Sequence, residues 1–172
     1  MEPHWRLMIE ADLDDVSRIA AAAHPEALSE RPDVFAEKLG LFPRGCLAFA
    51  LGERVAGYAF SHPWMLGDAP ALDAFLGALP ESPDCLYLHD LAIAAEARGR
   101  GEAARAIASL TALAAAERLG ALALIAVQGT DRFWTRAGFL DAPAPRLAAK
   151  LAGYGPGARY MIRRAAAQRA PE

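Results

Sequence analysis

A short glycine-rich segment carries the clearest chemical signal in this sequence. It follows an apolar stretch typical of a buried strand and opens an alanine-rich stretch typical of a helix; its residues are Arg98, Gly99, Arg100, Gly101, Glu102 and Ala103. Such a turn directs several backbone N–H groups to one point, and the helix dipole adds partial positive charge there. Glycine permits left-handed backbone angles and the close approach of a ligand. The segment therefore predicts a site for a phosphate group.

The elements that must position this segment alternate between strands and helices. Strands are expected at residues 5–9, 45–51, 55–61, 86–93, 122–128 and 158–163, with a further strand after residue 138. Helices are expected at residues 12–23, 33–39, 101–119 and 131–137, with one helical turn at 72–79. The fold class is therefore mixed α/β. The helix at 101–119 makes a β-α-β crossover, and the two strands that it joins should be parallel.

The bulk composition indicates one globular domain, because 172 residues suffice for a single core. A net charge of −3 gives no basis for binding nucleic acid, and no apolar run is long enough to span a bilayer. The first residues do not resemble a signal peptide, and the two cysteines form neither a metal-site spacing nor a disulfide framework. We expect a cytoplasmic protein with a domain over residues 1–164 and a disordered tail over 165–172. We expect no metal and no nucleic-acid or membrane partner.

Three motifs together resemble the GCN5-related N-acetyltransferases, the GNAT superfamily. Residues 98–103 fit the Arg/Gln-x-x-Gly-x-Gly/Ala signature of that family, and residues 91–93, Leu-Ala-Ile, resemble its apolar tripeptide just upstream. Residues 133–139, Phe-Trp-Thr-Arg-Ala-Gly-Phe, resemble its second signature, an aromatic helix that ends in Gly-Phe. The order of elements matches over nearly the whole chain. The resemblance implies a single domain with a twisted, mostly antiparallel sheet, flanking helices and a parallel strand pair that splays apart.

The same resemblance implies acetyl-CoA as co-substrate. In this family the loop amides bind the pyrophosphate of coenzyme A, and the pantetheine arm runs beside the preceding strand. The cofactor-binding residues that it implies are Leu91, Ala92, Ile93, Arg98, Gly99, Arg100, Gly101, Glu102, Ala103 and Trp134.

A closer resemblance, to the arylalkylamine (serotonin-type) N-acetyltransferases, comes from residues 87–93, Tyr-Leu-His-Asp-Leu-Ala-Ile. That subgroup carries a histidine just before a Leu-Ala-Val stretch. The resemblance implies transfer to the primary amine of a small molecule, an arylalkylamine or a diamine. A non-catalytic acyl-CoA-binding or regulatory domain and a protein-lysine acetyltransferase stay open as alternatives, as does a homodimer.

Acetyl transfer needs a base, because an alkylammonium with a pKa of ~10 is not a nucleophile. We expect His89 to be that base, acting through water, since the intrinsic pKa of histidine lies close to cellular pH. Asp90 is its expected catalytic partner. Alternation along a regular strand would place the two side chains on opposite faces, whereas a β-bulge would bring both into one cleft. The alternatives are a half-buried His89 bonded to a backbone carbonyl and an Asp90 that fixes a loop. His62 is expected to begin a turn, and the alternative is that it lines the mouth of the acceptor site.

Two positions depart from the family pattern. Trp134 stands where many relatives carry a tyrosine that is thought to protonate the leaving thiolate, and an indole N–H has no useful acidity. Tyr87, Tyr154, Tyr160 or solvent would then supply the proton. Glu102 lies in a loop expected to face phosphates, so we expect its carboxylate to point to solvent, where it suits the helix dipole.

Overall fold

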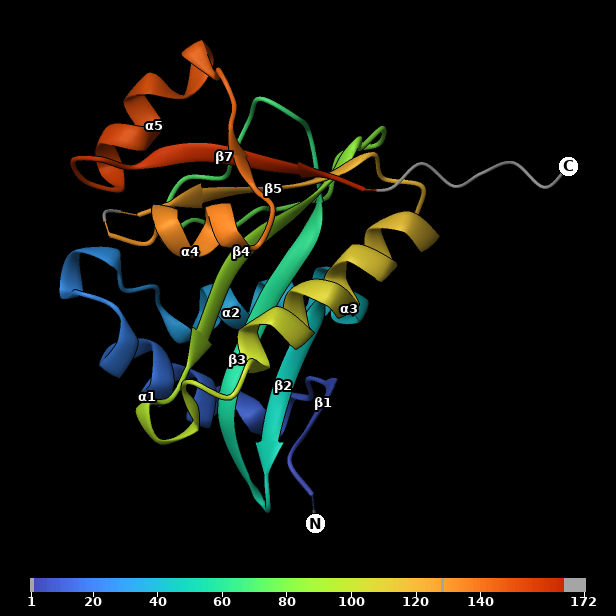
Figure 1. Ribbon diagram of the computed structural model, residues 1–172, viewed down its shortest axis with the longest axis vertical. Helices are drawn as coiled ribbons and strands as arrows, with labels where there is room; N and C mark the ends of the chain where they lie inside the picture. The colour runs from blue at the N-terminus through green and yellow to red at the C-terminus, as the bar shows by residue number, and fades with distance from the viewer. Residues whose placement is uncertain (1, 128, 166–172) are drawn as a thin grey trace, which may run out of the picture.

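The computed structural model describes residues 2–127 and 129–165. Its centre is a seven-stranded sheet with the strand order β1-β2-β3-β4-β5-β7-β6 (Figure 1). The strands are β1 (His4–Leu7), β2 (Cys46–Leu51), β3 (Arg54–Trp64), β4 (Cys85–Ile93), β5 (Ala121–Ala126), β6 (Leu140–Asp141) and β7 (Arg159–Arg164). Neighbouring strands are antiparallel except β4 and β5, which are parallel. The mixed α/β class and the crossover are thus confirmed, while residues 166–172 of the expected tail lie outside the described residues.

Helices cover both faces of this sheet. They are α1 (Leu13–Ala23), α2 (Pro32–Leu41), α3 (Glu102–Ala116), α4 (Asp131–Arg136) and α5 (Ala148–Gly153). Alternation along β3 separates the faces, because Tyr58 and Phe60 pack against α1 and α2 whereas Ala59 packs against α3. Among the residues that the structure describes, no helix is both long and apolar enough to cross a membrane.

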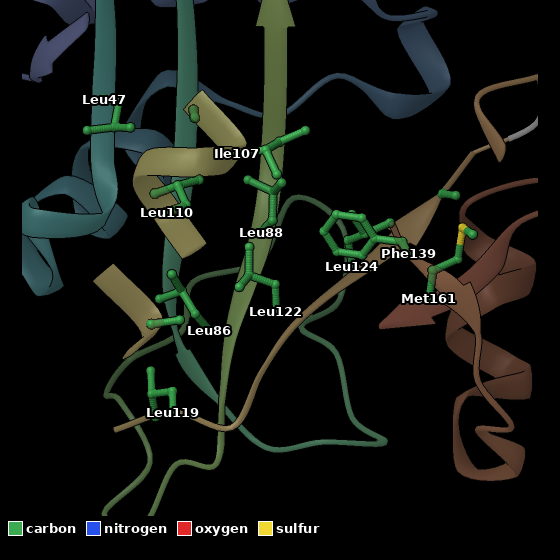
Figure 2. Close-up of a cluster of buried hydrophobic side chains, with 13 residues drawn as sticks. Leu47, Leu86, Leu88, Ile107, Leu110, Leu119, Leu122, Leu124, Phe139 and Met161 are labelled. Carbon is green, nitrogen blue, oxygen red and sulfur yellow. The ribbon is translucent and has the colours of Figure 1, made fainter. Parts of the chain in front are cut away.

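A leucine-rich core joins the two halves of the sheet. Ile107 and Leu110 of α3 pack in one cluster with Leu86 and Leu88 of β4, and Figure 2 shows this contact. The same cluster extends to the other half of the sheet through the buried side chains of Leu122, Leu124, Phe139 and Met161. Burial of apolar surface holds α3, and therefore the turn that precedes it, in a fixed position on the sheet.

Three local expectations were wrong. Residues 72–79 form no helix; instead the Glu37 carboxylate accepts hydrogen bonds from the amides of Leu76 and Gly77, at 2.8 and 2.7 Å. His62 does not begin a turn, because β3 runs on to Trp64 and His62 is paired with β4 and fully buried. The short helix α5 was not expected at all.

The parallel strands β4 and β5 separate soon after they meet. They are paired only from Cys85 and Ala121 to Tyr87 and Ala123, although β4 continues to Ile93. Figure 1 shows the two strands diverging beyond this point. The expected splay is therefore confirmed, and it leaves backbone groups of both strands without a neighbouring strand.

Candidate functional site

Two cavities lie where β4 and β5 diverge, one of about 1030 Å³ and a smaller one of about 110 Å³. They adjoin, because they share the lining residues His24, Leu28, Leu91, Val127, Thr130, Trp134 and Tyr154. The larger cavity extends along the end of β4 to the start of α3, and the smaller one lies against the middle of β4. A ligand that fills both would therefore connect the glycine-rich turn with the residues of β4.

The glycine-rich turn presents unpaired amides to the larger cavity. Gly99 and Gly101 have φ angles of 78° and 79°, in the left-handed region that favours glycine. Within the described part of the chain, no backbone or side-chain acceptor is bonded to the amides of residues 99–104. Unpaired amides at the N-terminus of a fifteen-residue helix suit an anion. The geometry thus agrees with a phosphate site.

All of the expected cofactor-binding residues except Arg100 line the larger cavity. The Arg100 side chain is exposed instead. Arg98 turns back toward the strand, where its Nε donates to the carbonyl oxygen of Ile93 at 2.8 Å. This bond ties the end of β4 to the turn, and it uses a carbonyl that the resemblance placed beside pantetheine.

The expectation that Glu102 points to solvent is wrong. Its residue is only 6% exposed and lines the larger cavity. β1 lies against this turn, because the Trp5 indole donates to the Glu102 backbone carbonyl at 3.1 Å. Arg105 bonds to Oε1 of the carboxylate at 2.8 Å, whereas Oε2 is buried without a partner among the described residues.

A β-bulge in β4 brings His89 and Asp90 to the same cavity. Phe60 pairs with Asp90 and Ser61 pairs with Leu88, so His89 is the extra residue of the bulge. Both His89 and Asp90 line the smaller cavity. The β-bulge that would bring both side chains into one cleft, one of the two possibilities in the sequence analysis, is therefore present.

His89 belongs to a buried charged cluster. Its Nε2 lies 2.7 and 2.9 Å from the two carboxylate oxygens of Glu30, and Lys38 Nζ lies 3.9 Å from the same carboxylate. The His89 side chain is 1% exposed, and its Nδ1 is buried without a partner among the described residues. Burial raises the pKa of Glu30, but the His89 hydrogen bond and the nearby cations outweigh burial, so the net shift is downward. Glu30 is therefore held as a carboxylate.

Asp90 connects two side chains that the sequence analysis did not place in the site. Its Oδ1 lies 2.9 Å from His24 Nε2, and its Oδ2 accepts a hydrogen bond of 2.6 Å from the Tyr58 hydroxyl. His24 follows the last residue of α1, and its side chain is 22% exposed. The hydrogen bond that Asp90 accepts from His24 raises the pKa of His24, although burial opposes this. Its only sequence signal was the His-Pro pair that ends the helix.

The aromatic residues divide between core and cavity. Trp134 lines both cavities, and Tyr154 is the one tyrosine of the three expected proton donors that does so. Tyr87 is buried among core residues, and the Tyr160 hydroxyl accepts from the Gly67 amide at 3.0 Å. Within residues 2–127 and 129–165, no group of three or more His, Cys, Asp or Glu side chains is placed to hold a metal ion.

Comparison with known proteins now gives the family. The model of the acetyltransferase (GNAT) family matches residues 13–139. The chain belongs to the GNAT family. This confirms the family resemblance of the motifs and the single GNAT domain with its splayed strand pair. No curated protein matches this GNAT chain.

Solved structures share the GNAT fold at low sequence identity. One is the loading GNATL domain of CurA from Lyngbya majuscula, with a TM-score of 0.76, 13% identity and coverage of 94% of this chain and 96% of that one. The GNAT-like decarboxylase GphF, in complex with isobutyryl-CoA, has a TM-score of 0.75 and 14% identity over 94% and 98%. YhbS from Escherichia coli, a GNAT N-acetyltransferase in complex with CoA, has a TM-score of 0.65 and 17% identity over 96% and 83%. These likenesses concern the fold, since one fold hosts several activities.

Proposed function

We propose that this GNAT protein transfers the acetyl group of acetyl-CoA to the primary amine of a small molecule with an apolar body, an arylalkylamine or a diamine. The observation that carries the proposal is a continuous pair of cavities with unpaired amides at one end and two carboxylates at the other. Phosphates suit the amides, and an ammonium group suits the carboxylates. The amides thus suit the phosphates and the two carboxylates suit the ammonium group, while the Glu102 carboxylate at the amide end is paired with Arg105 through Oε1.

At the cofactor end, the amides of residues 99–104 would bind the pyrophosphate of coenzyme A. The pantetheine arm would lie against residues 91–93, where β4 has lost its parallel neighbour. Trp134 offers an apolar surface beside that path. A bound isobutyryl-CoA in GphF and a bound CoA in YhbS, proteins of the same fold, support this choice of cofactor.

At the acceptor end, the smaller cavity is largely apolar but contains the carboxylates of Glu30 and Asp90. Its apolar residues are Leu28, Leu72, Leu88, Leu91, Leu124, Ile125 and Val127. One buried cation, Lys38, lies 3.9 Å from the Glu30 carboxylate, so the two carboxylates of this cavity outnumber the one lysine beside them. An amine with an apolar body satisfies both features, and this supports the arylalkylamine resemblance of β4.

The chemical roles follow from this placement. Holding the amine beside the thioester supplies much of the rate enhancement, and a base must remove one ammonium proton. The sequence analysis predicted His89 as that base, with Asp90 as its partner. His89 lines the smaller cavity, which supports the prediction, but its Nε2 is bonded to Glu30 and its Nδ1 is buried, so a second histidine of the cavity, His24, competes for the role. Tyr154, which lines both cavities, is our proposed proton donor to the sulfur.

A panel of amines tests the proposed function. Release of the coenzyme A thiol is measured with acetyl-CoA and 2-phenylethylamine, tryptamine, a linear diamine or a lysine-containing peptide, and product mass is recorded. We expect acetylation of the small amines. The matched control is the N,N-dimethyl form of each amine, which keeps the charge and the apolar body but gives no stable amide. Binding of acetyl-CoA without transfer to any amine would favour the non-catalytic domain, and transfer to the peptide alone would favour the protein-lysine enzyme.

A further inference from the structure

We propose that His24, held by Asp90 and Tyr58, is the general base that deprotonates the acceptor amine. This inference rests on the proposed function and adds to it a residue outside the family motifs. His24 lines both cavities, so it lies where the acyl group and the amine would meet. It comes from the end of α1, 66 residues before Asp90 in the chain.

The hydrogen-bond pattern determines which nitrogen of His24 is basic. The carboxylate of Asp90 accepts from the Tyr58 hydroxyl through Oδ2 and faces His24 Nε2 through Oδ1. An ionised carboxylate only accepts hydrogen bonds, so Nε2 carries the proton in neutral His24. The lone pair then lies on Nδ1, which has no protein partner among the described residues. This is the arrangement that a base needs: one nitrogen is fixed by a carboxylate and the other is available to a substrate.

Exposure distinguishes His24 from His89. The His24 side chain is 22% exposed, whereas that of His89 is 1% exposed and its Nε2 lies within 2.9 Å of both oxygens of Glu30. A base must exchange its proton with solvent after each turnover. His24 meets that requirement, and His89 is better suited to hold Glu30 in place.

The charged groups around His24 favour its protonated form once it has accepted a proton. Asp90 on β4 faces it directly, Glu30 on the α1–α2 connection adds a more distant negative charge, and Tyr58 and Tyr154 are the neutral polar neighbours. The Asp90 hydrogen bond raises the pKa of His24, and burial, which lowers it, is the smaller effect. The imidazolium is thus stabilised where it forms. Asp90 and Tyr58 act through His24 and are positioning residues.

The proposed step balances without any further reactant. An N–H bond of the ammonium breaks and the Nδ1–H bond of His24 forms. The neutral amine then forms the C–N bond as the C–S bond of the thioester breaks, and the second proton lost by nitrogen ends on the coenzyme A sulfur. His24 returns its proton to solvent, so one proton is released per turnover.

The test measures kcat/KM against pH for the unmodified protein and for the variants His24→Gln, Asp90→Asn and His89→Gln, with His4→Gln as the matched control. His4 is an exposed histidine on β1, outside both cavities. We expect His24→Gln to reduce kcat/KM about 10²- to 10⁴-fold at neutral pH and to remove the acidic limb of the profile. The dissociation constant of the His24→Gln variant for acetyl-CoA, measured by calorimetry, should equal that of the unmodified protein.

Asp90→Asn should lower kcat and move the acidic limb to lower pH, because His24 loses the hydrogen bond that raises its pKa. His89→Gln should keep the limb. The NMR titration of the His24 imidazole is an independent readout. Its midpoint in the unmodified protein should coincide with the pH of the acidic limb, and this midpoint should move to lower pH in Asp90→Asn. Two results would overturn this inference alone. One is loss of the acidic limb in His89→Gln, and the other is an unchanged kcat/KM and pH profile in His24→Gln. An unmodified protein that acetylates no amine would instead overturn the proposed function, and the base assignment with it.

Discussion

At the scale of single residues, the proton for the leaving sulfur is the open chemical question. The indole of Trp134 cannot supply it, because its N–H is not acidic in the working range. Tyr154 lines both cavities, and burial raises the pKa of its phenol, so the hydroxyl stays protonated at neutral pH. It donates a hydrogen bond to the Pro70 carbonyl at 3.3 Å, a long bond that a better acceptor can replace.

We expect Tyr154→Phe to lower kcat about tenfold with little change in the affinity for acetyl-CoA. The loss of rate should be small for the removal of a general acid, because a thiol with a pKa of ~8.5 leaves readily as the thiolate even without a proton donor. Pre-steady-state thiol release measures it. Tyr160→Phe is the matched control, since the Tyr160 hydroxyl bonds to Gly67 away from both cavities. Equal rates in the two variants would assign the proton to solvent.

The residues that the sequence analysis misplaced are fixed by contacts distant in the chain. Glu102 was expected in solvent from its place in a first helical turn, but Trp5 reaches that turn from β1. His24 gave no local signal beyond the His-Pro pair that ends the helix, because its partner Asp90 belongs to another element. By contrast, the roles expected for residues 91–93 and 98–103 depend on a strand, a turn and a helix that follow one another directly. Local patterns could therefore predict the glycine-rich turn and the end of β4, which line the larger cavity, but not the residues facing Asp90.

At the scale of elements, the glycine-rich turn and helix α3 form one unit. The apolar contacts of Ile107 and Leu110 fix the helix on the sheet, and the left-handed angles of Gly99 and Gly101 aim the preceding amides at the cavity. Alternation and helical periodicity predicted these elements well because each buries a continuous face. The short helix α5 and the segment at 72–79 lack such a face and take their shape from neighbours, so the sequence did not predict them.

We expect Gly101→Val to weaken acetyl-CoA binding at least about tenfold, because a β-branched residue disfavours positive φ and its side chain would crowd the amides. Gly52→Val is the matched control. Gly52 has a φ of 67° in the hairpin between β2 and β3, and an added Cβ at either glycine meets no atom within 4 Å. Both variants should lose stability, but only Gly101→Val should raise the dissociation constant in calorimetry. Equal affinities would contradict the phosphate assignment.

At the scale of the whole molecule, the cluster of Glu30, His89 and Lys38 holds three separate parts of the chain together. Glu30 lies on the α1–α2 connection, Lys38 on α2 and His89 on β4, and all three side chains are at most 5% exposed. Lys38 also donates to the Ala74 carbonyl at 3.3 Å, which fastens the segment after β3. Removing one partner from a buried charged group is costly, because the other charge remains in a medium of low polarity.

We expect Lys38→Met to lower the free energy of unfolding by about 3 kcal/mol, measured by urea denaturation. Lys150→Met is the matched control and should cost less than about 1 kcal/mol, because Lys150 and its partner Asp68 are 39% and 47% exposed. The pKa of Glu30 is lowered in the folded state, so its stabilisation is present above its unfolded pKa and is lost as the pH falls through the folded pKa. Lys38→Met should therefore also unfold at a higher pH on acidification. Equal losses in the two variants would contradict the role of the cluster.

The extra residue in β4 constrains the length of this strand. Deleting His89 or Asp90 would restore regular pairing with β3, yet only one of the two polar side chains would then remain at the smaller cavity. A conservative substitution at His89 or Asp90 leaves the backbone path intact, whereas the deletion of one residue removes the β-bulge that brings both side chains to one cavity. In a mutational scan, this stretch should therefore tolerate exchanges far better than changes in residue number.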